Sequence, residues 1–343
     1  GGTTLSGNDI QELRKRIENK NFTSGSGNYE TLDMVKQYIE RITSDIKLAR
    51  NMKVIVDCGN GVPGAVAPQL LRELGCEVTE MFCDVDGNFP NHHPDPSKPE
   101  NLQDLKQALA ESDADIGLAF DGDGDRLGVV TTQGEVIWAD RQLMLYAQDI
   151  LARNPGGDII FDIKCTIKLP KVIEEAGGNP IMWKTGHSFI KAKLKETGAL
   201  LAGEMSGHIF FKERWYGFDD ALYTASRLLE ILSKDPRPAT EIFGELPDSV
   251  NTPELNLNMA EGEHFKLIEK LVSNANFKGA KLTTIDGVRA DWDDGFGLVR
   301  ASNTTPCLVF SFEGNKEQAL ERIKDSFRQL VKENTGPELQ IPF

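Results

Sequence analysis

The sequence predicts an α/β fold: successive three-layer α/β domains with mixed sheets, followed by a C-terminal α+β domain. The α/β part is predicted because the apolar runs Val54–Val56 and Asp158–Phe161 are each followed by a loop and an amphipathic helix. The region beyond the proline-containing stretch Pro236–Pro253 is instead rich in strand-like runs and closes with one long helix, which is typical of an α+β domain. A chain of 343 residues has room for about two to four domains.

The N-terminal region is predicted to hold two helices and a first strand–loop–helix unit. Ser6 or Asn8 can cap a helix over Asp9–Lys20, and the Gly/Ser-rich linker Thr23–Asn28 separates it from a helix near Thr31–Ile46. Short apolar runs then alternate with amphipathic segments. The strands expected here are Val54–Val56, Glu77–Phe82, Ile116–Phe120 and Leu127–Val130, and the helices are Ala65–Leu74 and Leu102–Ser112.

A second α/β block begins near Trp138. Its first strand ends in Asp162, much as the earlier run ends in Asp57, which suggests that the two blocks are related. Its expected helices are Arg141–Arg153, Leu169–Ala176, Ser188–Thr197 and Ala221–Leu232, and its expected strands are Asp158–Phe161, Pro180–Trp183, Ala199–Ala202 and Ile209–Phe211. The final block is expected to contain the strands Leu255–Met259, Lys281–Ile285, Gly297–Arg300 and Cys307–Phe312 and the helix Lys316–Val331.

The most informative motif is Asp121-Gly-Asp-Gly-Asp-Arg126, which joins two predicted strands. Its glycines allow a sharp loop, so the carboxylates of Asp121, Asp123 and Asp125 can converge on one point. Three anionic oxygens with no Cys or His nearby suit Mg²⁺, and Arg126 can hold a phosphate through two hydrogen bonds. An ordinary acidic turn is the alternative. A calcium-binding EF-hand loop is excluded, because it needs Gly sixth and Glu twelfth where this chain has Arg126 and Thr132.

A second candidate site is the loop Gly203-Glu-Met-Ser-Gly-His208 between two apolar runs. Glu204, Ser206 and His208 alternate, so in an extended chain their side chains point the same way. A carboxylate, a hydroxyl and an imidazole on one face suit a polyol such as a sugar. The alternative is an ordinary polar turn.

Two histidines are candidates for moving protons near neutral pH. His208 belongs to the loop just described, and His187 ends the segment Lys184-Thr-Gly-His187 that follows another predicted strand. The alternative for each is a solvated loop histidine. The remaining histidines are expected to be structural: His92, His93 and His264.

The segment Arg300-Ala-Ser-Asn-Thr-Thr-Pro306 is a candidate phosphate cradle. One guanidinium, three hydroxyls and an amide crowd into six residues, and turn N–H groups can add to them. The side chains concerned are those of Arg300, Ser302, Asn303, Thr304 and Thr305. The alternative is again a polar turn.

The composition of the chain limits the classes of binding partner that can be expected. The formal charge of −15 argues against a wide nucleic-acid or anionic-membrane surface. No apolar run is long enough to span a bilayer, and no signal peptide is recognised. The five cysteines form no C-x-x-C pair, and Cys58, Cys165 and Cys307 lie in or beside apolar runs, so buried free thiols in a reducing cytoplasm are expected. We therefore expect a cytoplasmic protein that binds neither nucleic acid nor membrane. We also expect it to be a monomer.

Taken together, these segments closely resemble the α-D-phosphohexomutases, above all the bacterial phosphomannomutase/phosphoglucomutase branch. The matching stretches follow the family order and are Val56–Gly61, Asp121–Arg126, Lys184–His187, Gly203–His208, Trp215–Asp220 and Arg300–Pro306. The resemblance implies a four-domain isomerase of carbohydrate metabolism that interconverts hexose 1-phosphates and 6-phosphates of mannose or glucose. It also implies Mg²⁺, an enzyme phosphoserine, and a hexose 1,6-bisphosphate as intermediate and activator.

The resemblance divides the chain into a remnant of the first domain with a linker (1–33), a second α/β domain with the metal loop (34–135), a third with the sugar loop (136–247) and an α+β fourth with the phosphate loop (248–343). One departure concerns the Thr-Ala-Ser-His-Asn-Pro-like segment that carries the family's phosphoserine, because the sequence contains none. Thr224-Ala-Ser-Arg227 lies inside a predicted helix and is a decoy. The chain is therefore expected to begin downstream of the serine and to be inactive alone.

The resemblance also implies a role for each candidate residue. Asp121, Asp123 and Asp125 hold Mg²⁺, while Arg126 and Lys164, which lies just past the strand Asp158–Phe161, support the transferring phosphoryl group. Protons are moved by His208 or His187, which with Lys164 also contact the substrate. The remaining substrate contacts are Glu204 and Ser206 to sugar hydroxyls and Arg300, Ser302, Asn303, Thr304 and Thr305 to the non-reacting phosphate.

Two other functions compete with the mutase. The chain could bind metal and sugar phosphate without chemistry, or it could be a metal-dependent phosphatase. The phosphatase is disfavoured because no Asp-x-Asp-x-Thr motif occurs: position 125 is Asp. The choice between glucose and mannose stays open, since no residue obviously reads the C2 hydroxyl.

Overall fold

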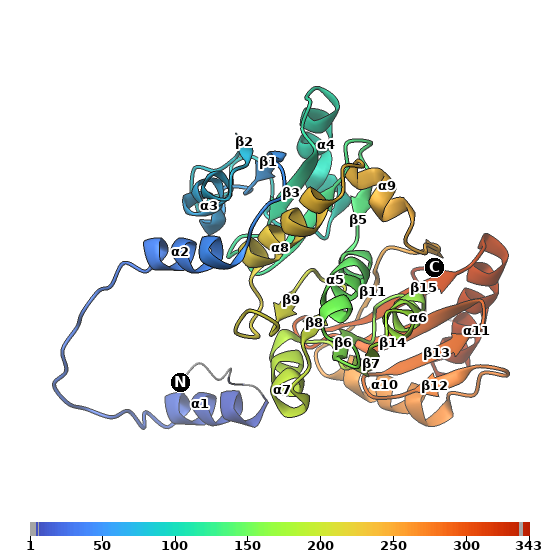
Figure 1. The fold of residues 1–343 in the computed structure, drawn as a ribbon. Coiled ribbons are helices and arrows are strands. Elements are labelled where there is room, and N and C mark those ends of the chain that lie inside the picture. Colours follow the sequence, from blue (N-terminus) through green and yellow to red (C-terminus); the bar gives the residue numbers. More distant parts are fainter. Residues whose placement is uncertain (1–4, 6, 336–338) are drawn as a thin grey trace.

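The computed structural model describes residues 5, 7–335 and 339–343. Three β-sheets follow one another along the chain, each with helices packed on it (Figure 1). This confirms the predicted fold class of successive α/β units with mixed sheets and a terminal α+β unit. Among the described residues, no helix is both long and apolar enough to cross a bilayer.

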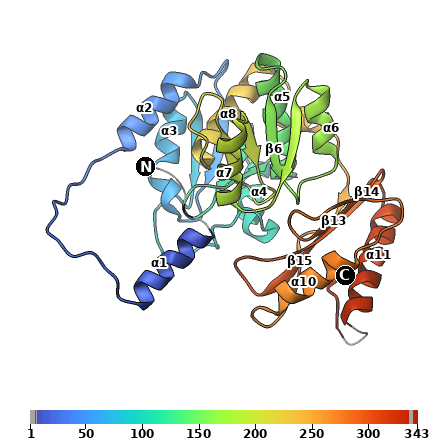
Figure 2. The same ribbon diagram turned by 90° about the horizontal axis from the view of Figure 1, so that it is seen from below.

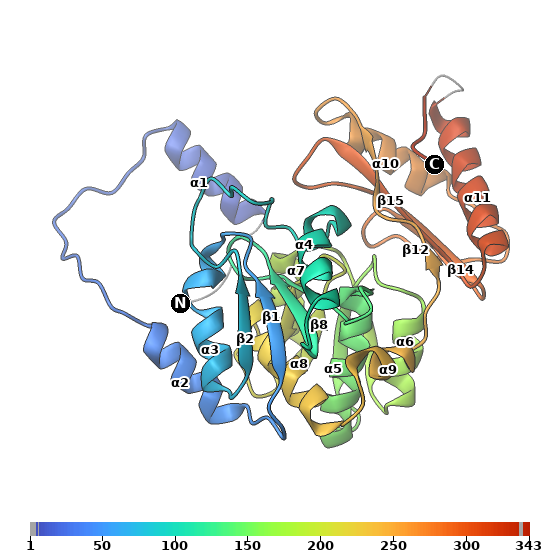
Figure 3. The same cartoon turned by 90° about the horizontal axis from the view of Figure 1, so that it is seen from above.

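The N-terminal helix α1 (Asn8–Glu18) stands away from the rest of the chain. It buries no residue, and its apolar stripe of Ile10, Leu13 and Ile17 is exposed. Residues 21–34 form no regular secondary structure and loop away from the body in all three views (Figures 1, 2 and 3). The predicted cap at Asn8 is wrong, because Gly7 is the N-cap and Asn8 is already helical, and the alternative cap, Ser6, lies outside the described residues.

The first sheet has the strand order β2-β1-β3-β4-β5. Strand β1 runs parallel to β2 and β3, and the remaining neighbours are antiparallel. Alternate residues of β1 face opposite sides, so Val54 and Val56 pack on one layer of helices and Ile55 on the other. The strands are β1 (Lys53–Asp57), β2 (Glu77–Met81), β3 (Ile116–Phe120), β4 (Leu127–Val130) and β5 (Val136–Ile137), and the helices are α2 (Val35–Asp45), η1 (Val62–Ala65), α3 (Ala67–Glu73), η2 (Pro99–Leu102) and α4 (Gln103–Ala110).

The second sheet repeats the pairing pattern of the first. Its order is β7-β6-β8-β9, with β6 parallel to β7 and β8 and a closing antiparallel pair. Asp57 and Asp162 therefore end equivalent strands, and the hairpin β3–β4 corresponds to β8–β9. The elements are β6 (Asp158–Asp162), β7 (Asn179–Trp183), β8 (Leu201–Gly203), β9 (Ile209–Phe211), α5 (Ala139–Arg153), α6 (Lys168–Glu175), α7 (His187–Thr197), α8 (Ala221–Lys234) and α9 (Ala239–Gly244).

The first two units share one apolar core, and helix α8 joins them. Residues of α8, such as Leu229, belong to the same buried cluster as Ile42 of α2 and Leu143 of α5. Polar contacts reinforce the junction, because Glu230 and Ser233 of α8 accept backbone N–H groups of Lys47 (3.3 Å) and Ala49 (2.9 Å) respectively. The loops at the carboxyl ends of both sheets are thus held in a fixed relation.

The third sheet forms the α+β unit, which Figure 3 shows set to one side of the other two. Its order is β10-β15-β14-β13-β12, with β11 also paired to β15. One face packs against α10 and α11. The elements are β10 (Val250–Asn251), β11 (Leu255–Asn258), β12 (Lys281–Thr283), β13 (Val288–Trp292), β14 (Gly295–Ala301), β15 (Cys307–Gly314), α10 (Glu263–Asn274) and α11 (Glu317–Thr335).

The other face of the third sheet docks on the second unit. Phe296 and Leu298 of β14 form a small buried cluster with Ile163, which follows β6. The fully buried Arg289 lies over the Phe296 ring at 3.8 Å and donates to the carbonyl oxygens of Cys165 (2.8 Å) and Ile163. A buried arginine whose donors meet carbonyls of another unit fixes the docking geometry.

Candidate active site

The acidic loop between β3 and β4 is ordered around Asp121. Its Oδ1 accepts backbone N–H groups of Gly124 (3.0 Å), Asp125 (3.0 Å) and Arg126 (3.1 Å), and Arg126 Nε donates to Oδ2 at 2.7 Å. The carboxylate is buried, and burial raises the pKa of Asp121 to about 6, with nearby Asp125 adding to the rise and Arg126 opposing it. The loop thus concentrates negative charge that its own arginine only partly offsets.

The three aspartates of this loop form a possible metal site. Asp121, Asp123 and Asp125 each offer one carboxylate oxygen, and these oxygens lie within 4.8 Å of one another. Asp121 is buried, Asp123 exposed and Asp125 intermediate, so the group opens toward solvent on one side. An all-oxygen, anionic donor set fits the preference of Mg²⁺.

Two neighbouring segments hold the acidic loop in place. The turn after β1 approaches so closely that a Cβ on Gly61 would lie 2.8 Å from the carbonyl oxygen of Gly122, and Val62 N donates to that oxygen at 2.9 Å. Asp95, on the loop between β2 and η2, accepts a hydrogen bond from Arg126 Nη1 at 3.1 Å. The turn after β1 therefore packs against the backbone of the acidic loop, and Asp95 holds the side chain of Arg126.

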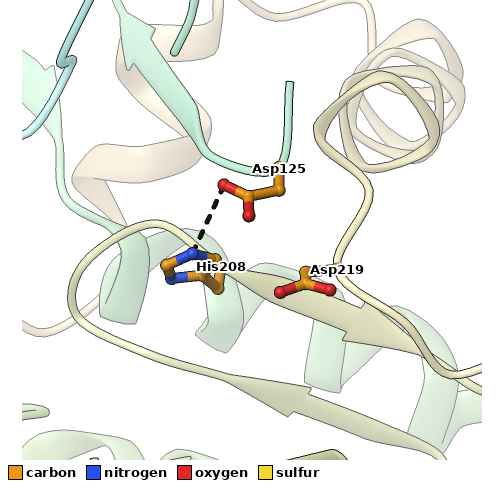
Figure 4. A group of neighbouring side chains, drawn as sticks. All are labelled: Asp125, His208 and Asp219. Atoms are coloured by element: carbon orange, nitrogen blue, oxygen red, sulfur yellow. Dashed lines mark ion pairs between the residues drawn. The ribbon is translucent and has the colours of Figure 1, made fainter. Parts of the chain in front are cut away.

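The metal loop and the sugar loop touch directly. Arg126 and His208 form an antiparallel β-bridge between the two hairpins. His208 Nε2 lies 3.3 Å from Asp125 Oδ1, an ion pair marked by the dashed line in Figure 4. The other ring nitrogen of His208, Nδ1, lies 2.9 Å from Ser206 Oγ. Burial alone would lower the pKa of His208, but Asp125 and Glu204 outweigh it, so the pKa is raised and the ring favours its charged form.

His187 joins the same cluster from the start of α7. Its ring stacks on that of His208 with centroids 5.6 Å apart, and its Nδ1 lies 3.3 Å from Asp219 Oδ2. Lys191 donates to Asp219 Oδ1 at 2.8 Å. Asp219 was not predicted as a site residue, although it lies in the matched stretch Trp215–Asp220. With Asp125 and His208 it forms a second group whose ligand atoms lie within 4.8 Å of one another (Figure 4).

Glu204 is almost completely buried at the base of the sugar loop. Its Oε1 accepts the backbone N–H of Gly186 at 2.5 Å, and burial, with a contribution from Asp162, raises its pKa to about 7. Asp162 is a second unpredicted residue: it accepts the Thr185 hydroxyl at 2.8 Å and the Met205 N–H at 3.1 Å. It therefore ties the segments that carry His187 and His208 together.

The third unit reaches the site through Arg300. Arg300 Nε donates to Asp286 Oδ2 at 2.9 Å, and the same oxygen accepts the backbone N–H of Thr185 at 3.1 Å. Lys164 is mostly buried and pairs with Glu254 at 3.1 Å. Burial alone would lower the Lys164 pKa, but Glu254 and Asp162 outweigh it and raise the pKa, so the lysine stays charged.

The candidate phosphate cradle is a compact turn between β14 and β15. Ser302 is buried, and its Oγ accepts backbone N–H groups of Thr304 (3.3 Å) and Thr305 (3.2 Å). Asn303, Thr304 and Thr305 are exposed. The turn thus presents an amide and two hydroxyls to solvent at the end of the strand that carries Arg300.

Two residues that were not candidates for the site, His92 and Ser226, are held by hydrogen bonds within the fold. His92 is held by buried Asp57 at 3.0 Å, and this hydrogen bond raises its pKa to about 9. Ser226 of the decoy segment is completely buried in α8, where its hydroxyl donates to the Leu222 carbonyl. A pocket of about 750 Å³ is lined by residues that include Leu145, Arg237 and Leu246. None of the candidate metal, sugar or phosphate loop residues lines it.

Comparison with known proteins identifies relatives across the chain. The family described as phosphoglucomutase/phosphomannomutase matches through its alpha/beta/alpha domain II (residues 36–134), its alpha/beta/alpha domain III (138–250) and its C-terminal domain (254–330). A phosphomannomutase/phosphoglucomutase of Pseudomonas putida is 57% identical over 343 residues, which is 100% of this chain and 74% of that protein.

Solved structures agree. A phosphoglucomutase/phosphomannomutase family protein of Burkholderia thailandensis is 56% identical with a TM-score of 0.95, covering 100% of this chain and 73% of its own. The fold extends to an Aspergillus fumigatus N-acetylphosphoglucosamine mutase, solved with GlcNAc-6P and magnesium, at 15% identity and a TM-score of 0.59 over 87% of this chain and 68% of that one.

Proposed function

This chain belongs to the phosphoglucomutase/phosphomannomutase family, and we propose that it supplies the metal, sugar and phosphate loops of an enzyme that interconverts hexose 1-phosphates and hexose 6-phosphates of glucose or mannose. The observation that carries the proposal is the β-bridge between Arg126 and His208, which sets the metal loop against the sugar loop. The link from Arg300 through Asp286 to Thr185 then adds the phosphate loop.

In this proposal the aspartates of the metal loop hold Mg²⁺. Bound there, the ion would neutralise charge on the transferring phosphoryl group. Asp121 is already fixed by three backbone N–H groups and Arg126, so its orientation does not depend on the ligand. Arg126, held on its other side by Asp95, would steady the phosphoryl oxygens.

His208 is the proposed proton carrier. Asp125 and Glu204 flank it and keep it charged, so it can donate a proton to a sugar oxygen as that oxygen leaves phosphorus. In the reverse direction the neutral ring accepts the proton of the attacking hydroxyl. His187, stacked beside it and held by Asp219, is the alternative carrier.

The phosphate loop would hold the phosphate that is not reacting. Such a site accepts either phosphate of a hexose 1,6-bisphosphate. The same loops can therefore serve both half-reactions once the bisphosphate has reoriented in the site. The phosphoryl carrier in the proposal is a phosphoserine, and no segment of the 343 residues resembles the family's serine motif. The second candidate function, favoured by this observation alone, is binding of Mg²⁺ and sugar phosphate without turnover.

Calorimetry on Arg300→Ala and Glu204→Ala tests the division of labour between the loops. Arg300→Ala removes a charge-assisted contact worth roughly 1.5–3 kcal/mol, so affinity for glucose and mannose phosphates should fall by about 10- to 150-fold to a similar extent. Glu204→Ala should weaken sugar phosphate binding but leave inorganic phosphate binding nearly intact, because Glu204 lies in the sugar loop.

Arg322→Ala is the matched control, since Arg322 is an exposed arginine of the same unit that pairs with Asp294. Its affinity should equal that of the parent. Thermal melting of each variant separates lost binding from lost folding, because Arg300→Ala also removes the guanidinium that pairs with Asp286. Unchanged sugar phosphate affinity in a folded Arg300→Ala protein would show that the arginine is structural.

A further inference from the structure

Two of the five cysteines lie side by side next to the metal loop. The sulfurs of Cys58 and Cys83 are 3.5 Å apart and hydrogen-bonded, and both thiols are free. Strands β1 and β2 end with Asp57 opposite Met81, so the two cysteines follow that pair on neighbouring strands. In a regular strand they would face opposite sides of the sheet, but Phe82 adopts the left-handed conformation (φ 49°) and breaks the alternation.

The remaining cysteines are not paired in this way. Cys76, Cys165 and Cys307 are buried, and within the described part of the chain no hydrogen bond joins any of them to another thiol. Cys58 is fully buried, whereas Cys83 is only partly so. Cys83 is therefore the more solvent-accessible of the two residues.

We propose that Cys58 and Cys83 form an oxidative modification site, in which Cys83 reacts with a peroxide and Cys58 then closes a reversible disulfide that alters the metal loop. No part of this follows from the mutase reaction, which neither consumes nor produces an oxidant.

The chemistry balances with one equivalent of hydrogen peroxide. The Cys83 thiolate attacks one peroxide oxygen, giving a sulfenic acid and hydroxide. The Cys58 sulfur then attacks the sulfenic sulfur, the S–O bond breaks, and water leaves as the S–S bond forms. Two thiols are oxidised, one peroxide is reduced to two waters, and an added dithiol reverses the step. The side-chain hydrogen bond between Cys83 and Cys58 lowers the pKa of Cys83, which supports its role as the attacking thiolate.

Disulfide formation would shift the turn that packs against the metal loop. A disulfide is about 2.05 Å long, so the sulfurs must approach by roughly 1.5 Å. Gly61 N donates to the Cys58 carbonyl at 2.7 Å, and Asn60 N donates to the Phe82 carbonyl at 2.7 Å. Backbone hydrogen bonds thus connect the turn that begins at Cys58 to the segment that carries Cys83. That turn contacts Gly122 of the metal loop without room for even a Cβ on Gly61. We therefore expect oxidation to change Mg²⁺ affinity.

Thiol counting tests the modification directly. The reduced chain should show five alkylatable thiols after denaturation. After hydrogen peroxide treatment it should show three, with the loss restored by dithiothreitol and a peptide linking Cys58 to Cys83 in the mass spectrum. Cys83→Ser and Cys58→Ala should each abolish the crosslink, while Cys307→Ser should retain it. Five free thiols after treatment, or a crosslink between other cysteines, would overturn the proposal.

A Mg²⁺ titration tests the coupling to the metal loop. Calorimetry should show at least a threefold difference in Mg²⁺ affinity between the oxidised and reduced chain, and none between treated and untreated Cys83→Ser. Equal affinities in the two forms of the parent would overturn the coupling. This readout rests on the proposed metal site whereas thiol counting does not, so a chain that crosslinks but binds no Mg²⁺ in either form would refute the metal site and leave the disulfide standing.

Discussion

A protein of these 343 residues is expected to show no measurable phosphohexomutase turnover. Catalysis in the proposed mechanism needs a residue that gives a phosphoryl group to the sugar and takes one back, and the chain contains no segment like the family's serine motif. Ser226, the serine with the most similar local sequence, is completely buried and bonded within α8. Electrostatic stabilisation by the metal loop then has no transfer on which to act.

The assay supplies glucose 1-phosphate, glucose 1,6-bisphosphate and Mg²⁺ and follows glucose 6-phosphate. The Pseudomonas putida relative, 57% identical to this chain, serves as the positive control in the same buffer. Calorimetry with glucose 1-phosphate should still show binding, which separates an inactive chain from an unfolded one. A turnover close to that of the relative would mean that another side chain among these residues carries the phosphoryl group.

Asp123→Asn is expected to cause the largest loss among single substitutions, in a version of the enzyme that carries the phosphoserine segment. The change removes one ligand charge from the metal site, and the rate should fall by at least about a hundredfold, or ~2.7 kcal/mol of transition-state stabilisation. Folding should persist, because Asp123 is the exposed member of the three aspartates.

The control for Asp123→Asn is Asp113→Asn, which changes an exposed aspartate that pairs with Lys53 and contributes to no candidate site. Its rate should match the parent. Mg²⁺ titration of both variants should show weakened binding only for Asp123→Asn. Parental activity and Mg²⁺ affinity in Asp123→Asn would mean that the acidic loop is only a turn.

The sequence predicted the fold well where apolar periodicity was strong. The buried strand at Val54–Val56 and the helices α3 and α6 that follow β1 and β6 were predicted from the spacing of apolar residues. Strand β13 was missed, although Val288, Ala290 and Trp292 alternate with polar residues, Asp286-Gly287 is a strong hairpin signal and Gly287 has the expected positive φ. Helix α10 was also missed, despite apolar residues at helical spacing.

The candidate site was only partly predictable. A motif within one loop, such as Asp121–Arg126, can be recognised from the spacing of its residues. The residues that hold the loops together cannot be recognised in this way. Asp219, Asp286 and Asp162 act through partners that folding brings from distant segments. Two of them gave a signal: Asp162 is the polar end of an apolar strand, and Asp219 lies in the matched stretch Trp215–Asp220.

In the proposed mechanism, three loops of this chain form one site, with a metal at one end and a phosphate at the other. Crystals of the chain grown with Mn²⁺ and glucose 1,6-bisphosphate test it most directly through the anomalous signal of manganese. One manganese peak is expected among the carboxylates of Asp121, Asp123 and Asp125, with one phosphate near Arg126 and the other on the loop from Arg300 to Thr305. Manganese bound only between Asp125, His208 and Asp219, or a bisphosphate bound away from both loops, would contradict it.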